Sequence, residues 1–253
     1  MQAEKIIGIV GGVGPFAGLD LQQKILQETT AARDQDYLSV ISISQPGEIP
    51  DRTAYLLTET AVSVNPAIPI TRQLLTLERA GAQIAGIPCN SAHAAPIFDA
   101  IRSGLQQAGS QLTLLHMIDE VARFLRQHMS GVQRVGVLST TGTRLARIYP
   151  AALEPAGFTV LTPSETVQTE LIHPAIYDPE YGIKANGRAT AKSRSDLLTG
   201  VAALQQAGAQ AIILGCTEIP LALTESQIDG IPLVDATRVL ARALIREAVV
   251  AGS

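Results

Sequence analysis

The sequence predicts an α/β protein built from two similar halves, each with a mainly parallel sheet. Short β-branched runs alternate with longer stretches of helical pattern, as in chains of βαβ units. Glycine-marked strand patterns recur at a nearly constant offset, which indicates a duplication. Hydrophobic residues make up 46% and charged residues 17% of the 253 positions. This composition is typical of a well-buried globular chain long enough for two domains.

The first half is expected to contain four strands and three helices. The strands are expected at 6–10, 37–44, 83–87 and 112–115, and the helices at 15–33, 66–80 and 95–108. In the first helix, the spacing of Leu19, Ile25 and Leu26 predicts that these side chains form its buried face.

The second half repeats landmarks of the first. Ile7-Gly8-Ile9-Val10 returns 128 residues later as Val135-Gly136-Val137-Leu138, Gly14 returns as Gly142, and Ala80-Gly81-Ala82-Gln83 returns 127 residues later as Ala207-Gly208-Ala209-Gln210. Cys89 and Cys216 are separated by the same 127 residues. We therefore expect an N-terminal domain of residues 1–115 plus 226–253 and a second domain of residues 116–225. A helix at 236–250 has no counterpart and is expected to pack on the first half.

Both cysteines follow a predicted strand, Cys89 after 83–87 and Cys216 after 211–214. Ligands of parallel α/β sheets bind beyond the carboxyl ends of the strands. Asn90 or Ser91, and Thr217, could cap helices there, whose N-terminal amides would lower the pKa of each thiol. If the halves face each other, the two sulfurs approach one ligand from opposite sides. The alternative is that both cysteines are small buried apolar side chains.

Two opposed thiols suit the inversion of a stereocentre, which needs a base on one face and an acid on the other. The carbanion between them also requires fixed hydrogen-bond donors near the α-carboxylate. Candidate donors are the side chains of Asn90, Ser91, Thr140 and Thr217 and the amides of the loop containing Gly12.

Five motifs, in order, resemble the aspartate racemases of the aspartate/glutamate racemase superfamily. They are IGIVGGVGP from residue 7, IPDRTA from 49, PCNSAH from 88, YGIKANG from 181 and LGCTEIP from 214. The resemblance implies two pseudo-symmetric, flavodoxin-like parallel-sheet domains with the active site in the cleft between them. It also implies a homodimer and racemisation of aspartate without pyridoxal phosphate (PLP) or another cofactor, with Cys89 and Cys216 as the acid/base pair.

By the same resemblance, Arg52 and Lys184 would bind the substrate carboxylates, which is chemically sensible for these cations. Val13 replaces a methionine common in the family's first loop, and Ser91 replaces a threonine. Glu218 follows Cys216-Thr217 where glutamate racemases carry histidine, which favours aspartate as substrate. Glu218 could orient Cys216, or simply be a carboxylate at a helix start.

Other functions remain open. A glutamate, broad-specificity dicarboxylic amino acid or hydantoin racemase, or a maleate isomerase, would share the motifs, and a dicarboxylate-binding module is the non-enzymatic alternative. The Gly-x-Gly-x-x-Ala pattern from Gly12 is weak evidence for NAD because no acidic residue ends the second strand. The histidines show no metal-binding spacing, although His93, four residues after Cys89, could tune that thiol.

The net charge of −4 and pI near 5.6 provide no basic surface for nucleic acid or an anionic membrane. Glycines and Pro15 interrupt the apolar segment 6–19, which is too short to span a bilayer. We therefore expect a cytoplasmic enzyme acting on a small molecule.

Overall fold

The computed structural model describes residues 4–57 and 64–249. The chain divides into two compact units, one formed by Met1–Glu120 with Thr237–Ser253 and the other by Val121–Ala236. No helix in the described ranges combines the length and the apolar character needed to cross a membrane.

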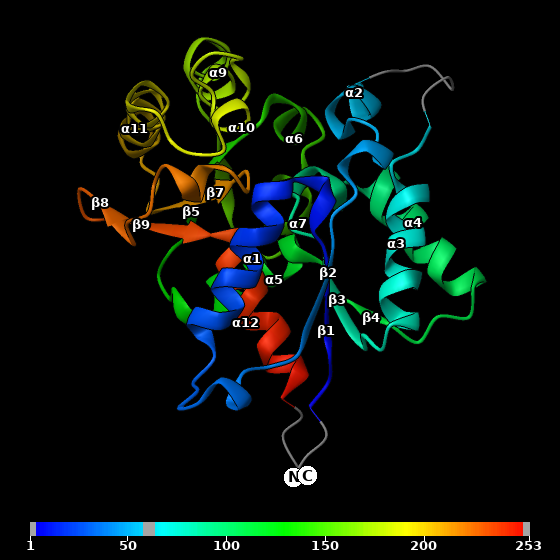
Figure 1. Ribbon diagram of the computed structural model, residues 1–253. Helices are drawn as coiled ribbons and strands as arrows, with labels where there is room; N and C mark the ends of the chain where they lie inside the picture. The colour runs from blue at the N-terminus through cyan, green and yellow to red at the C-terminus, as the bar shows by residue number, and fades with distance from the viewer. Residues whose placement is uncertain (1–3, 58–63, 250–253) are drawn as a thin grey trace. The chain divides into compact units, whose positions relative to one another are not determined.

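The first unit is an α/β layer structure around a four-stranded parallel sheet (Figure 1). Its strands are β1 (Ile7–Val10), β2 (Val40–Ile43), β3 (Ile84–Gly86) and β4 (Thr113–Leu114), in the order β2-β1-β3-β4. Its α-helices are α1 (Pro15–Glu28), α2 (Arg52–Leu57), α3 (Ala67–Arg79), α4 (Ala95–Gln107) and most of α12 (Ala236–Ala248), while α5 (Met117–His128) leads into the second unit. Short 3₁₀ turns are η1 (Gly11–Val13), η2 (Asp34–Asp36), η3 (Pro46–Glu48) and η4 (Asn90–His93).

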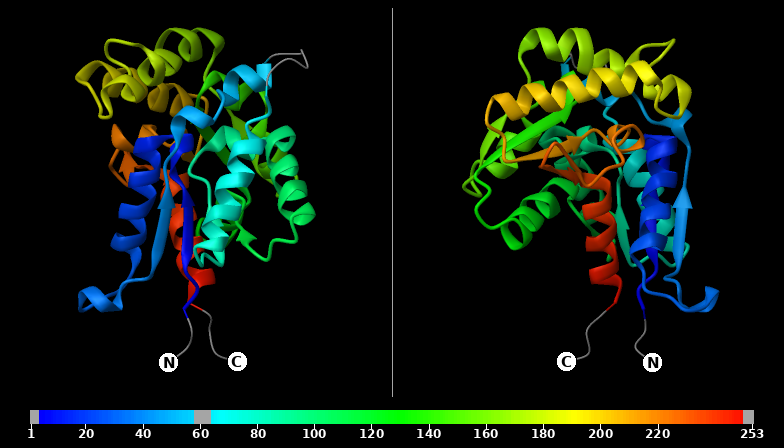
Figure 2. Two further views of the ribbon diagram at one scale, coloured as in Figure 1. Left: turned by 45° about the vertical axis from the view of Figure 1, so that its right-hand side comes forward. Right: turned by 90° about the vertical axis from the view of Figure 1, so that its left-hand side faces the viewer.

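Helices cover both faces of this sheet, α3 and α4 on one side and α1 and α12 on the other (Figure 1). A Cβ atom at Gly86 of β3 would lie 3.1–3.4 Å from Leu240 and Leu244 of α12, so helix and strand pack in direct contact. Figure 2 shows α12 beside α1, where Arg238 and Arg242 both form ion pairs with Glu28. The prediction that the last helix packs on the first half is confirmed.

The buried face of α1 differs from the predicted one. Ile25 is buried, but Leu19 and Leu26 are 66% and 43% exposed. The close approach of Gly18 to Gly11 explains the difference, because a Cβ at Gly18 would lie 2.5 Å from the Gly11 Cα. A glycine contact therefore fixes how the helix is turned, and the helix ends at Glu28 instead of residue 33.

The second unit contains β5 (Arg134–Ser139), β6 (Thr159–Leu161), β7 (Ala211–Gly215), β8 (Gln227–Ile228) and β9 (Ile231–Asp235), in the order β6-β5-β7-β9-β8. Its helical elements are α6 (Thr141–Leu145), α7 (Ile148–Leu153), α8 (Glu165–Val167), the π-helical turn η5 (Gln168–Ile172), α9 (His173–Tyr177), α10 (Ile183–Asn186), α11 (Ala191–Gln206) and η6 (Ile219–Leu221). Only β8 is antiparallel. Because β8 and β9 complete this sheet, the unit extends to Ala236, whereas the predicted domain ended at residue 225.

The strand register supports the duplication. Ile7 pairs with Ile84 and Gly8 with Ala85 in the first sheet; their counterparts 128 and 127 residues later, Val135 with Ala211 and Gly136 with Ile212, pair in the second. The order β2-β1-β3-β4 is likewise repeated as β6-β5-β7-β9. The two halves therefore share topology and register as well as sequence landmarks, which confirms the predicted fold class.

Candidate functional site

The two cysteines occupy equivalent places in the two sheets. Each lies three residues beyond a paired residue of the central strands, since Ile9 pairs with Gly86 and Val137 with Ile213. Gly12 lies three residues after Ile9 and Thr140 three residues after Val137, so each occupies the position matching a cysteine on the neighbouring strand, at the carboxyl edge of its sheet. The structure thus places four of the predicted site residues where ligands of parallel α/β sheets bind.

Cys89 is buried and begins a tight turn. Its backbone N–H donates to the Ile87 carbonyl at 2.8 Å, and the Ala92 N–H donates to the Cys89 carbonyl at 3.2 Å. The Cys89 sulfur lies 3.3 Å from the Ser91 hydroxyl, and either group can be the donor. Ser91 and the buried Asn90 belong to η4, so these three predicted residues lie together.

Cys216 belongs to a buried polar cluster centred on Glu218. The Cys216 thiol donates to Glu218 Oε2 at 3.0 Å, and the Thr217 hydroxyl donates to the same oxygen at 3.2 Å. Glu218 Oε1 forms an ion pair with the Lys184 ammonium group. Four predicted site residues therefore meet in one cluster, and the Lys184 charge is directed at Glu218.

These contacts determine where the protons reside. Burial and the Glu218 carboxylate raise the pKa of the Cys216 thiol well above its usual value, against the opposing effect of Lys184. Burial disfavours the Glu218 carboxylate, but the charge of Lys184 and the surrounding hydrogen bonds outweigh it and lower the Glu218 pKa. Burial likewise works against the Lys184 ammonium, but Glu218 raises its pKa overall. Cys216 is therefore a neutral thiol beside an ion pair.

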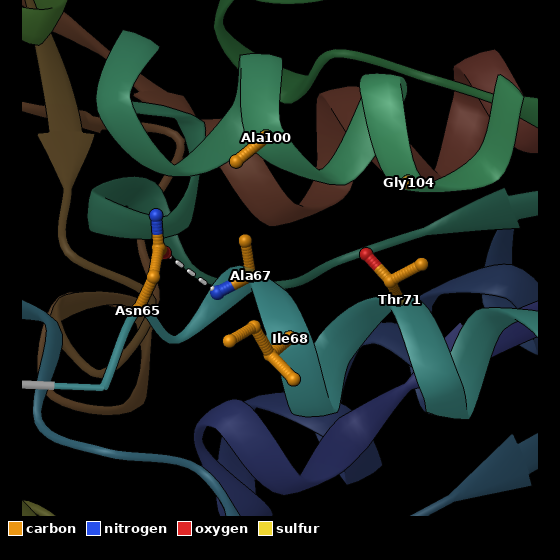
Figure 3. Close-up of a pocket in the computed structure, with 6 residues that line it drawn as sticks. All are labelled: Asn65, Ala67, Ile68, Thr71, Ala100 and Gly104. Atoms are coloured by element: carbon orange, nitrogen blue, oxygen red, sulfur yellow. Dashed lines mark hydrogen bonds between the residues drawn. The ribbon is translucent and has the colours of Figure 1, made fainter. Parts of the chain in front are cut away.

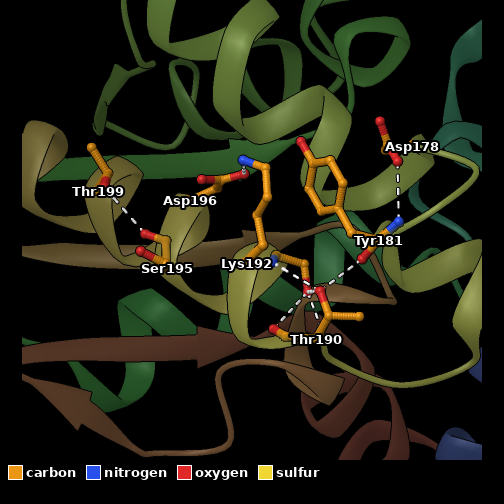
Figure 4. A network of polar contacts seen from close by, with 8 residues as sticks. Asp178, Tyr181, Thr190, Lys192, Ser195, Asp196 and Thr199 are labelled. Carbon is orange, nitrogen blue, oxygen red and sulfur yellow. Dashed lines mark hydrogen bonds and ion pairs between the residues drawn. The ribbon is translucent and has the colours of Figure 1, made fainter.

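The turn that precedes α10, the short helix carrying Lys184, is anchored through Tyr181 (Figure 4). The Asp178 carboxylate accepts the Tyr181 N–H at 3.0 Å, and the Thr190 hydroxyl donates to the Tyr181 carbonyl at 2.8 Å. Lys192 lies over the Tyr181 ring at 4.5 Å and pairs with Asp196 at 2.9 Å. These contacts hold Tyr181, three residues before Lys184, against the start of α11.

Arg52 begins α2 and is oriented by backbone oxygens of its own unit. Its guanidinium group donates to the Val13 carbonyl at 2.7 Å and to the Pro50 carbonyl at 3.3 Å. Arg52 therefore lies against η1, the turn that contains Gly12. A Cβ at Gly12 would lie 2.4 Å from the Gln45 backbone N, so close packing alone requires glycine there.

The predicted capping roles are wrong for three residues. Asn90, Ser91 and Thr217 form no side-chain cap, because each cysteine leads into a 3₁₀ turn. η6 has only three residues, so no helix N-terminus lowers the pKa of Cys216. Thr140 is the cap that does form, accepting the Thr143 N–H at the start of α6.

Two residues near the cysteines were not predicted as site residues from the sequence. Tyr149 is fully buried, and a Cβ at Gly215, the residue before Cys216, would lie 2.9 Å from the ring. Burial, with Cys216 and Asp235 nearby, raises the Tyr149 pKa well above its usual value, so the phenol stays neutral. His116 donates to the His93 carbonyl at 3.2 Å. No local motif marks either residue.

A groove of about 250 Å³ lies elsewhere, between α3 and α4 (Figure 3). It is lined by Asn65, Ala67, Ile68, Thr71, Ala100 and Gly104. None of the predicted site residues lines it. Within residues 4–57 and 64–249, no three His, Cys, Asp or Glu side chains are grouped as they would be to bind a metal ion.

Comparison with known proteins places the sequence and the fold among racemases. The Asp/Glu/Hydantoin racemase family model matches residues 10–244. The chain is similar to the aspartate racemase of Picrophilus torridus, with 29% identity, TM-score 0.78, and coverage of 96% of this chain and 94% of that one. An aspartate racemase homologue of Pyrococcus horikoshii gives 26% identity and TM-score 0.73, covering 96% and 99%.

A more distant solved structure agrees on the fold, and one sequence relative covers half of the chain. Glutamate racemase of Francisella tularensis is 14% identical with TM-score 0.67, covering 99% of this chain and 85% of that one. An uncharacterised protein of Pectobacterium carotovorum is 34% identical over 129 residues, which are 50% of this chain and 79% of that protein. Since the family model spans nearly all of both units, the chain belongs to the Asp/Glu/Hydantoin racemase family.

Proposed function

We propose that this racemase interconverts L- and D-aspartate without PLP or a metal ion, using Cys89 and Cys216 as its acid/base pair. The observation that carries the proposal is the equivalent position of the two thiols, each three residues past a matched pair of the duplicated sheets. A duplicated fold with one ionisable group per half suits a reaction that needs one such group on each face of a carbon atom.

The proton balance of the proposed reaction is simple. One cysteine, as thiolate, removes the α-proton and leaves the electron pair on the α-carbon. The other, as thiol, donates its proton to the opposite face, so the product is the other enantiomer and the two sulfurs have exchanged protonation states. The reverse reaction restores the starting state with no oxidant or reductant.

The contacts of Cys216 favour it as the proton donor of the resting enzyme. Its thiol donates to a carboxylate that keeps its charge because Lys184 neutralises it, so Glu218 holds the thiol proton in a fixed direction without removing it. In this scheme, Cys89 is the base for the first turnover. After that turnover, Lys184 is the cation that stabilises the Cys216 thiolate, because its charge lowers the Cys216 pKa.

Aspartate is the proposed substrate because the relatives at 26–29% identity include an aspartate racemase and an aspartate racemase homologue. The glutamate racemases among the similar structures are 14–18% identical and share only the fold. Arg52 and Lys184 are the proposed partners of the carboxylates. Since Lys184 already pairs with Glu218, we expect Arg52 to contribute more to substrate affinity.

The test is incubation of the purified protein with L-aspartate in D₂O, followed by NMR and chiral chromatography. We expect deuterium at the α-carbon together with D-aspartate, no PLP absorbance and no inhibition by chelators. Cys89→Ala and Cys216→Ala should abolish racemisation yet retain slow hydrogen exchange with opposite enantiomers. Racemisation by either variant at the wild-type rate would exclude the two-thiol mechanism.

Parallel reactions separate the alternatives. Faster racemisation of L-glutamate than of L-aspartate would make glutamate the substrate. Formation of fumarate from maleate would indicate a maleate isomerase. Binding of aspartate without exchange would leave only the dicarboxylate-binding role. The homodimer, the cytoplasmic location and the absence of nucleic-acid and membrane partners stay predictions.

A further inference from the structure

We propose that His93 is a positioning residue for Cys89, which fixes the turn carrying the thiol without touching the sulfur. The inference rests on the proposed function, in which Cys89 transfers the α-proton. The key atom is the Ile87 carbonyl oxygen, at which two hydrogen bonds of the turn meet. This oxygen accepts the Cys89 N–H at 2.8 Å and lies 3.0 Å from His93 Nε2.

The direction of the His93 hydrogen bond is determined by its partner. A carbonyl oxygen can only accept, so Nε2 must carry a proton. His93 is 3% exposed, and burial, together with the neighbouring His116, lowers its pKa to about 3. The imidazole is therefore neutral at any working pH, with its one proton on Nε2, and this contact does not titrate near neutrality.

A second contact closes the far end of the turn. His116 Nε2 donates to the His93 backbone carbonyl at 3.2 Å, and His116 Nδ1 lies 3.2 Å from both the backbone N and Oδ1 of Asp119. The rings of His93, His116 and Phe98 pack together, with centroids 4.5–5.0 Å apart. The turn from Ile87 to His93 is thus held at its first and last carbonyls by two imidazoles.

This arrangement suggests a positioning role because the geometry of proton transfer is demanding. Displacing a reacting group by about 1 Å can cost about 100-fold in rate. Cys89 starts a turn with few regular backbone hydrogen bonds, so its orientation depends on the contacts at the two ends. The Ser91 hydroxyl touches the sulfur, whereas His93 acts only through the backbone.

The variants are His93→Leu, which removes the donor, and His93→Gln, whose Nε2 amide can replace it. His128→Gln is the control, because His128 is an exposed histidine whose ring stacks on Phe124 of its own helix. We expect His93→Leu to lower kcat about 10- to 100-fold with little change in KM. His93→Gln should restore most of the rate, and His128→Gln should match the wild type.

The decisive readout is the isotope effect on kcat/KM with α-deuterated L- and D-aspartate. A misaligned Cys89 slows proton removal from one enantiomer and proton delivery in the opposite direction. In His93→Leu the isotope effect should therefore rise for one enantiomer and fall for the other. A purely structural defect lowers the active fraction and leaves both isotope effects unchanged.

Each outcome decides the inference. Unchanged isotope effects in a folded His93→Leu protein, or a His93→Gln loss as large as that of His93→Leu, would overturn it. If His93→Leu does not fold, His116→Phe removes the second contact at a partly exposed position and should show the same asymmetry to a smaller extent. Symmetric effects there would also overturn it. An inactive wild type refutes the proposed function instead.

Discussion

The ion pair between Glu218 and Lys184 can be tested through Glu218→Gln, which removes the charge but keeps the shape. The Glu218 side chain is 6% exposed and that of Lys184 27% exposed. Removing one partner of a fully buried pair costs about 3–5 kcal/mol. Because Lys184 retains some hydration, we expect about 2–3 kcal/mol here, which lowers Tm by about 4–12 °C in a protein of this size.

A double-mutant cycle isolates the pair. Lys184→Met leaves Glu218 buried without its cation and should cost a similar amount. The double variant replaces both charges by neutral groups. We expect its loss in free energy of unfolding to be about 2 kcal/mol smaller than the sum of the two single losses. Urea unfolding of the four proteins at neutral pH measures this coupling.

The same variants change the Cys216 thiol in opposite directions. Glu218 raises and Lys184 lowers the Cys216 pKa. In a Cys89→Ala background, iodoacetamide should therefore alkylate Cys216 faster in Glu218→Gln and more slowly in Lys184→Met than in the parent. Equal alkylation rates in all three proteins, or strictly additive stabilities in the cycle, would refute the assignment of this cluster.

Two further predictions follow from the first unit. Arg52→Ala should lower kcat/KM for aspartate about 10- to 150-fold through loss of a charge-assisted hydrogen bond, with a much smaller effect on Tm; unchanged kinetics would remove Arg52 from the site. The His93 pKa of about 3 predicts an acid-dependent loss of stability, because the unfolded chain binds a proton below 6.5 and the folded chain does not. Between about pH 6.5 and 5, this loss should reach about 2 kcal/mol in the wild type and be absent from His93→Gln, as urea unfolding at both pH values would show.

The sequence predicted most of the fold because the duplication leaves a local signature in each strand. Gly8 and Gly136 lie at matched positions of β1 and β5, and each pairs with the strand that leads to a cysteine, Gly8 with Ala85 and Gly136 with Ile212. The buried face of α1 was not predictable from hydrophobicity, because the contact of Gly18 with Gly11 determines it. The predicted second domain ended before β8 and β9 because β8, the edge strand, has only two residues and no recurring landmark marks either strand in the sequence.

Candidate site residues that are close in sequence also lie close together in the structure. Cys89 and Ser91, like Cys216 and Glu218, lie two positions apart, and the two side chains of each pair are in contact. Lys184 was identified as a cation, but its partner lies 34 positions away, beyond α11 and β7, and no sequence pattern brings the two together. The contact of His116 with the Cys89 turn was not predicted for the same reason, because His116 lies 23 positions after His93.

The placement of α12 has a consequence for folding during synthesis. The second unit is continuous in sequence and can fold as soon as Ala236 has left the ribosome. The first unit begins earlier but lacks the helix that covers Gly86 until Leu240 and Leu244 have been made. Domains usually fold in the order in which they are synthesised. Here the unit that contains residue 4 cannot complete the cover of its sheet until α12 has been made, so the two units complete their cores at nearly the same stage of synthesis.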